Sequence, residues 1–155
     1  MTTKNETGQR DYHKTIMVKI TPEEAFNNIT NVAGWWTNSF KGSARKLNDV
    51  FDVTFGETKV TFKVIEAVPC KKLVWLVTDC NLHWLKNKTE WNGTKIVWEI
   101  SEEKNATRIN MMHLGLLPGI ECYNDCEAGW DHYAGESLPK LITTGKGVLV
   151  QARHS

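Results

Sequence analysis

The sequence has almost no net charge, no long apolar run and no leader-like start. Its 19 basic and 18 acidic residues are interspersed and leave a formal charge of +1, so no part of the chain attracts nucleic acid or an anionic membrane. No stretch approaches the roughly 18 apolar residues of a membrane span, and the opening residues lack the apolar centre of a signal peptide. We therefore expect a cytoplasmic protein that neither binds nucleic acid nor spans a membrane.

The chain also lacks internal repeats, low-complexity tracts and a linker. Its 155 residues, of which 41% are hydrophobic, suffice for one domain with a sizeable core and are too few for a second. We expect a flexible tail at 1–12, a single domain at 13–147 and a C-terminal tail at 148–155. The four cysteines, without an export signal, are expected to be reduced thiols rather than a disulfide framework.

Tryptophan is present in excess, with seven copies. Each indole ring can bury roughly 150 to 250 Å², but it carries one N–H that needs an acceptor. So many rings predict either a well-filled interior or the wall of a pocket.

Apolar residues alternate along several short segments, which is the pattern of half-buried strands. The expected strands are 13–20, 51–55, 60–64, 73–77, 94–101 and 107–116. The segment 40–45, rich in Gly, Ser and Lys, is interpreted as a loop. A helix is expected from Pro22 to about Thr30, because Thr21 offers a cap and Glu24 can bond back to it. A second short helical turn is expected at 34–36.

The closing segment 120–145 has the period of a long amphipathic helix. Gly145 is suited to end it, and Pro139 lies inside it, where the missing N–H removes the bond to the Gly135 carbonyl and should bend the helix. The apolar residues recur in steps of three and four and form one stripe to be buried: Tyr123, Cys126, Trp130, Tyr133, Ala134, Leu138, Leu141 and Ile142.

Strands in hairpin succession followed by one long helix predict an α+β fold. Short turns between consecutive strands favour an antiparallel, strongly curved sheet. A helix with a single apolar stripe has to cover the concave face of such a sheet. Two short helices are expected near the N-terminus.

Particular segments carry a family resemblance: WNGTKIVWE at 91–99, HLGL at 113–116, CYxxCxxGW at 122–130 and SLxxLxxTGKG at 137–147. With the order of elements, they make residues 13–147 similar to the START-like (SRPBCC) superfamily, in the branch resembling the C-terminal domain of activators of the Hsp90 ATPase. The resemblance implies a helix-grip fold, in which a sheet of six or seven strands wraps around the C-terminal helix and leaves a cavity. Members bind lipids, sterols, polyketides or aromatic molecules, and some are cyclases.

A cavity of this kind is expected to be lined by large apolar side chains with few polar groups. The candidate lining residues are Trp35, Trp36, Phe62, Trp75, Trp84, Trp98, Met111, His113, Cys126, Trp130 and Tyr133. We assign no cofactor to it.

Histidines are weak candidates for catalysis. His113 is predicted to point inward beside Met111, and His132 lies near Trp130 on the helix; an imidazole titrates near neutral pH and can act as a general base. No Ser, Cys or carboxylate stands at a supporting spacing, so a buried, hydrogen-bonded histidine is the favoured interpretation and no catalytic residue is assigned.

Other polar groups also have a plainer interpretation than a functional site. A tetrahedral zinc site can be written down from Cys80, His83, Cys122 and Cys126, but Cys126 falls on the buried stripe, where a thiol packs well, so no metal is assigned. Glu66, Asp79 and Glu121 are candidates for a carboxylate at the cavity rim, although solvated positions at strand and helix ends are the default.

The residues leave three functions open. The leading one is a module that binds a small hydrophobic or aromatic molecule. The first alternative is a co-chaperone resembling the Hsp90 activators, which carry a separate N-terminal domain for which this chain has no residues. The second is an enzyme of the cyclase or dehydratase type that moves protons on a polyketide-like substrate, which fold analogy alone supports. We favour a binding module over an enzyme.

Overall fold

The computed structural model describes residues 11–149 except 38, 56, 84 and 117–122. It contains a seven-stranded antiparallel sheet with the strand order β1-β7-β6-β5-β4-β3-β2. The predicted α+β class and the antiparallel sheet are therefore confirmed. The strands are β1 (Tyr12–Val18), β2 (Phe40–Gly42), β3 (Val50–Phe55), β4 (Thr58–Val68), β5 (Lys72–Asn81), β6 (Lys95–Glu103) and β7 (Ala106–Leu114).

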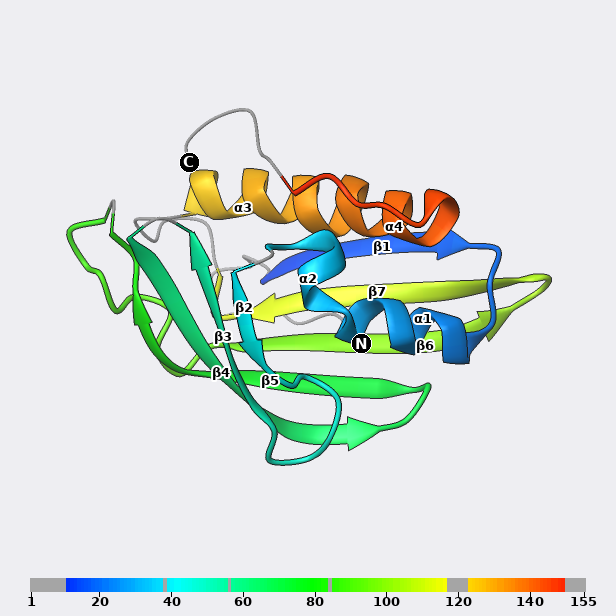
Figure 1. The fold of residues 1–155 in the computed structure, drawn as a ribbon, viewed down its shortest axis with the longest axis horizontal. Coiled ribbons are helices and arrows are strands. Elements are labelled where there is room, and N and C mark those ends of the chain that lie inside the picture. Colours follow the sequence, from blue (N-terminus) through cyan, green and yellow to red (C-terminus); the bar gives the residue numbers. More distant parts are fainter. Residues whose placement is uncertain (1–10, 38, 56, 84, 117–122, 150–155) are drawn as a thin grey trace.

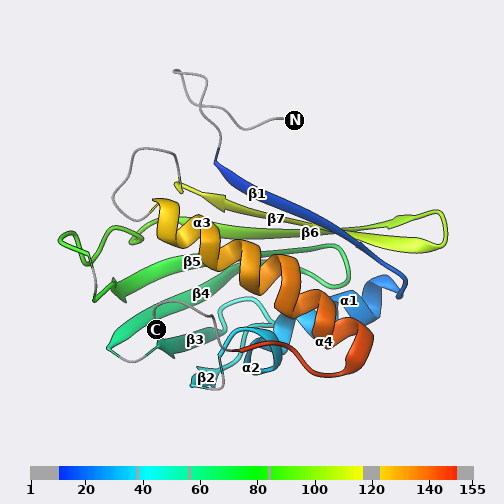
Figure 2. The ribbon, with the colours of Figure 1, turned by 90° about the horizontal axis from the view of Figure 1, so that it is seen from above.

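The helices all lie on one face of this sheet (Figure 1). Two short ones, α1 (Pro22–Thr30) and α2 (Val32–Trp35), follow β1, and α3 (Tyr123–His132), η1 (Tyr133–Ser137) and α4 (Leu138–Thr144) follow one another as a single long helix. Figure 2 shows the long helix crossing the sheet obliquely, with α1 and α2 beside its C-terminal half. Within the described part of the chain, no helix has the length and apolar character needed to cross a membrane.

Helix α1 begins as the sequence predicts. The Thr21 hydroxyl accepts a hydrogen bond from the Glu24 backbone N–H at 3.1 Å, and the Thr21 N–H donates to the Glu24 carboxylate at 3.0 Å. Two of the N–H groups that a helix start leaves without partners are thereby satisfied. The cap fixes the residue at which α1 begins after β1. From there α1 and α2 lie on the same face of the sheet as the long helix (Figure 1).

Our interpretation of 40–45 as a loop is wrong for its first half, because Phe40–Gly42 form the edge strand β2. Phe40 pairs with Val53 of β3. A strand of three residues is too short for alternation to show in the sequence. Gly42 has a φ of 107°, and a side chain there would collide with the backbone of Val50 and Phe51, so the glycine that suggested a loop is what lets the strand turn.

The long helix contains one irregular turn. In η1 the backbone N–H of Leu138 bonds the carbonyl of Tyr133, five residues back, instead of the residue four back. Pro139 follows at once and has no N–H to give to the Gly135 carbonyl. The irregularity predicted at the proline therefore takes the form of a π turn, and Gly145 closes the helix in the left-handed conformation with its N–H on the Leu141 carbonyl at 2.9 Å.

Candidate functional site

The residues predicted to line a cavity converge on the interface between the sheet and the long helix. Each of them in the described part of the chain is at most 8% exposed; Trp84 lies outside the described residues. They come from α2 and the residue after it, from four strands, and from α3 and η1: Trp35, Trp36, Phe62, Trp75, Trp98, Met111, His113, Cys126, Trp130 and Tyr133.

Six of these side chains form a continuous set of touching rings, which we call the aromatic cluster: Trp35, Trp36, Phe62, Trp75, Trp98 and Trp130. Trp36 is its centre, because it stacks on Trp35 at 5.5 Å between ring centroids, meets Trp130 of the long helix at 4.9 Å and meets Phe62 of the sheet at 5.8 Å. Trp98 adds edge-to-face contacts with Trp35 at 5.6 Å and with Trp75 at 5.5 Å. Such offset and edge-to-face pairs are the favoured aromatic geometries.

Two further aromatic residues belong to this interface and were missed at the level of sequence. Trp91, from the loop between β5 and β6, lies parallel to Trp130 at 6.2 Å and meets the His113 ring edge-on at 4.6 Å. Phe51 of β3 stacks on Phe62 at 4.8 Å. Trp91 escaped prediction because its loop has no hydrophobic period, so only the residue type itself could have indicated burial.

His113 lies in a chain of hydrogen bonds that fixes its proton. The Trp130 indole N–H donates to His113 Nδ1 at 3.0 Å. An indole nitrogen only donates, so Nδ1 must be unprotonated and the neutral ring carries its proton on Nε2. Nε2 lies 2.9 Å from the Thr94 hydroxyl, which in turn donates to the Trp91 carbonyl at 2.6 Å. Every polar atom of the imidazole is therefore paired.

Burial lowers the pKa of His113 to about 3. The physical cause is the removal of the imidazolium from water, and no charged partner among the described residues offsets it. The lone pair that a general base would use is engaged by Trp130. His113 thus joins the long helix to the sheet as a neutral donor and acceptor.

Trp98 differs from its neighbours in the cluster. The Trp35 indole N–H donates to the Ile29 carbonyl at 3.0 Å, and the Trp75 N–H donates to the Ala44 carbonyl at 3.3 Å. Trp98 is fully buried, yet its N–H has no hydrogen-bond partner among the described residues. Buried N–H groups are nearly always paired, and an unpaired one costs free energy.

Neither a protein-family model nor a curated protein matches this sequence, whereas many solved structures match the fold. An Aha1 dimer from Colwellia psychrerythraea aligns with a TM-score of 0.73 and 23% identity over 88% of this chain and 98% of that one. DynU16, from the dynemicin biosynthetic locus, aligns with a TM-score of 0.67 and 18% identity over 87% of this chain and 48% of that one. The protein SSP2350 from Staphylococcus saprophyticus aligns with a TM-score of 0.69 and 11% identity over 91% of this chain and 97% of that one.

This chain has a helix-grip fold, the fold that the resemblance to the START-like superfamily implies. The fold implied by the resemblance at 13–147 is thereby confirmed, and at these identities the likeness is one of fold. We call α3, η1 and α4 together the gripped helix. The aromatic cluster occupies the space between this helix and the sheet.

The gripped helix is tied to α2 by residues 145–149, which follow α4. We call these residues the strap. The Ser137 hydroxyl donates to the Trp35 carbonyl at 2.6 Å and accepts the Val148 N–H at 2.7 Å. Gly147 passes so close to the Gly34 carbonyl that a side chain there would collide with it. The strap therefore fixes the backbone next to Trp36, at the centre of the aromatic cluster.

His132, the second candidate base, serves this strap. Its Nε2 lies 2.9 Å from the Val148 carbonyl oxygen, and its Nδ1 lies 3.8 Å from the Glu136 carboxylate. Because a carbonyl oxygen only accepts, Nε2 must carry a proton and donate. His132 thus holds the strap against the long helix, a role that needs no catalysis.

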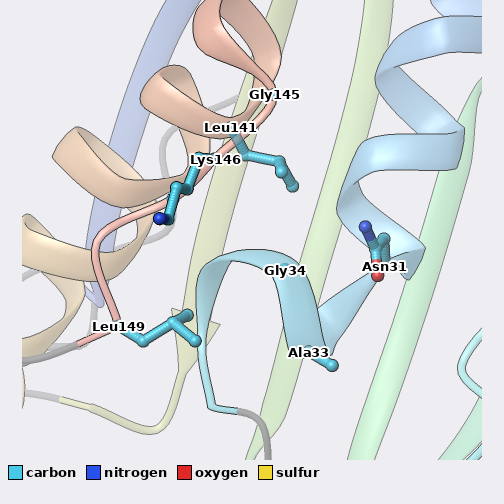
Figure 3. Close-up of a pocket in the computed structure, with 8 residues that line it drawn as sticks. Asn31, Ala33, Gly34, Leu141, Gly145, Lys146 and Leu149 are labelled. Atoms are coloured by element: carbon cyan, nitrogen blue, oxygen red, sulfur yellow. The ribbon is translucent and has the colours of Figure 1, made fainter.

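An open pocket of about 440 Å³ lies between α2, the end of α4 and the strap. Figure 3 shows the strap running alongside α2, with Leu141 above and Leu149 below. The lining residues come from α2 and the residue before it, the end of α4, and the strap: Asn31, Ala33, Gly34, Leu141, Gly145, Lys146, Gly147 and Leu149. None of the predicted lining residues is among them.

The remaining polar candidates lie away from the buried interface. Glu66 and Asp79 are exposed strand residues, and the Glu66 carboxylate oxygen Oε2 lies 3.7 Å from Lys72 Nζ. Glu121 and Cys122 fall outside the described residues. In the described part of the chain, no group of three or more His, Cys, Asp or Glu side chains could hold a metal ion.

Proposed function

We propose that this START-like chain binds a small hydrophobic or aromatic molecule between its sheet and its gripped helix. The observation that supports this proposal is the aromatic cluster. Its rings come from both layers, with Trp130 on the helix and Phe62, Trp75 and Trp98 on the sheet. A flat apolar molecule placed between the layers would meet aromatic rings on both sides, which is the lining expected of a small-molecule site.

Entry of a ligand requires the helix to move from the sheet, and the helix carries a feature suited to this. The π turn of η1 and Pro139 interrupt the regular bonding in the middle of the helix. Trp130 lies before the interruption and Leu141 after it. We therefore place the opening movement of the helix at this interruption.

Ligand binding is testable with named probes. We expect 9-fluorenone, a flat aromatic ketone, to quench the tryptophan emission saturably and to raise the melting temperature, because it contacts several indole rings at once. The Trp36→Leu variant, which removes the central ring, should weaken binding roughly tenfold or more. Val68→Ala, at an exposed residue of β4, is the matched control and should leave the titration unchanged.

The proposal fails if fluorenone and palmitate, as a linear lipid, both give no saturable response at concentrations up to their solubility. It also fails if Trp36→Leu, shown to be folded by circular dichroism, binds as tightly as the parent chain. Either outcome would leave the aromatic cluster as an ordinary core.

A second candidate function is modulation of a chaperone ATPase. The fold spans 98% of the Aha1 chain from Colwellia psychrerythraea. The sequence-level argument against this function, that the Hsp90 activators carry a separate N-terminal domain, therefore does not separate the present chain from that Aha1 chain. On this proposal, adding the purified chain to the Hsp90 of its own source should raise the ATPase rate in a concentration-dependent manner. An unchanged rate at saturating chain would exclude it.

A further inference from the structure

We infer that Trp98 makes the site selective for molecules that carry a hydrogen-bond acceptor, such as an aromatic ketone, over hydrocarbons of the same shape. The inference rests on the proposed ligand-binding function and adds the chemical class of ligand to it. Its basis is the buried indole N–H of Trp98, which has no hydrogen-bond partner in the described part of the chain.

The unpaired N–H is not a general property of the cluster. Trp35 and Trp75 flank Trp98 and are equally buried, but each donates to a backbone carbonyl. The Trp98 ring has edge-to-face contacts with both of these rings, at interplanar angles of 74° and 64°. An aromatic face is a much weaker acceptor than a carbonyl oxygen, so the N–H keeps most of its capacity to bind a ligand atom.

The other polar side chains near the cluster do not compete for the same ligand group. His113 uses both of its nitrogens, and the hydroxyl of Thr94 is committed to the His113 ring and to the Trp91 carbonyl. Among the described residues, Trp98 Nε1 is the buried side-chain nitrogen or oxygen that has no hydrogen-bond partner. A ligand that brings a carbonyl or ether oxygen pairs the Trp98 N–H, whereas a hydrocarbon of the same shape leaves this N–H unpaired.

A matched pair of probes isolates this effect. 9-Fluorenone and fluorene have nearly the same flat shape, but only fluorenone carries an oxygen that accepts a hydrogen bond. The quantity to measure, by equilibrium dialysis, is the ratio of their affinities, because changes in cavity shape and apolar contact affect both probes alike. We expect the ratio of fluorenone to fluorene affinity to fall roughly fivefold in Trp98→Phe, which keeps an aromatic ring and removes the donor.

Trp75→Phe is the matched control, since it removes an indole from the same cluster whose N–H already has a protein acceptor. Both affinities can fall in this variant, but their ratio should equal that of the parent chain. A ratio that is the same in the parent chain and in Trp98→Phe would overturn the inference while leaving ligand binding intact. Failure of both probes to bind the parent chain would overturn this inference, and a lack of response to palmitate as well would overturn the proposed function with it.

A measurement on the unaltered chain covers the case in which Trp98→Phe does not fold. In a ¹H–¹⁵N spectrum assigned through contacts with Trp35 and Trp75, the Trp98 indole proton should move downfield when fluorenone is added, as expected when an N–H gains an oxygen acceptor. Fluorene should not produce this shift. Equal shifts from the two probes would contradict a hydrogen bond from Trp98.

Discussion

Replacing Trp130 by alanine is expected to lower the free energy of unfolding by about 3–5 kcal/mol, the usual cost of truncating a buried tryptophan. The ring is 2% exposed and contacts both Trp36 and Trp91. It also donates to His113, so its loss removes the hydrogen bond that joins α3 to β7. Urea denaturation followed by circular dichroism measures the change.

Trp130→Phe separates the hydrogen bond from the packing. The phenyl ring keeps much of the contact area but leaves His113 Nδ1 buried without a donor, which we expect to cost about 1–3 kcal/mol. Met17→Ala, at a residue 51% exposed on β1, is the control and should change stability by less than about 0.5 kcal/mol. A cost below about 1 kcal/mol for Trp130→Ala would mean that this residue does not anchor the helix to the sheet.

The stability of the chain should fall as the pH is lowered from about 6.5 toward 3, through His113. Burial holds the pKa of this imidazole at about 3 in the folded chain, against 6.5 for an ordinary histidine. Between these values the unfolded chain binds a proton that the folded chain does not, so acid favours unfolding. The free energy of unfolding is therefore not lowered by His113 above pH 6.5, and it falls by about 1.4 kcal/mol per pH unit between pH 6.5 and about 3.

Urea denaturation at a series of pH values tests this, with His113→Asn as the diagnostic variant. The Asn oxygen can replace Nδ1 as acceptor for the Trp130 N–H, and the side chain does not titrate. The variant should lose about 1.4 kcal/mol per pH unit less than the parent chain on acidification. His83→Asn, at a histidine with a side chain 54% exposed, supplies the reference slope. Identical slopes in the parent chain and His113→Asn would contradict the assignment.

Local patterns predicted the elements well where one rule acted within a few residues. The Thr21 cap with Glu24 is a contact across one helical turn, and it forms as expected. The stripe on the closing helix is buried at Cys126, Trp130 and Leu138, because period and burial are the same property of an amphipathic helix. Prediction failed at β2, whose three residues depend on a partner strand for their pairing.

The site shows the same division. The positions of the large aromatic residues on inward faces predicted that they would gather between the sheet and the helix. That Trp91 would join them did not, because its loop is placed by the strands at its ends. The pairing of His113 with Trp130 joins residues 17 apart in the chain and from different layers, so no spacing rule could indicate it.

The sequence by itself determined the class of fold, the helix that is gripped and the apolar character of what surrounds it, because hydrophobic periodicity and capping are local and additive. Only the tertiary structure decided which polar atoms inside would find partners. It paired His113 with Trp130 and Thr94, and it left the Trp98 N–H without a partner among the described residues. Hydrogen bonds need atoms within about 3 Å at suitable angles, and such distances are set by the packing of whole layers rather than by neighbours along the chain.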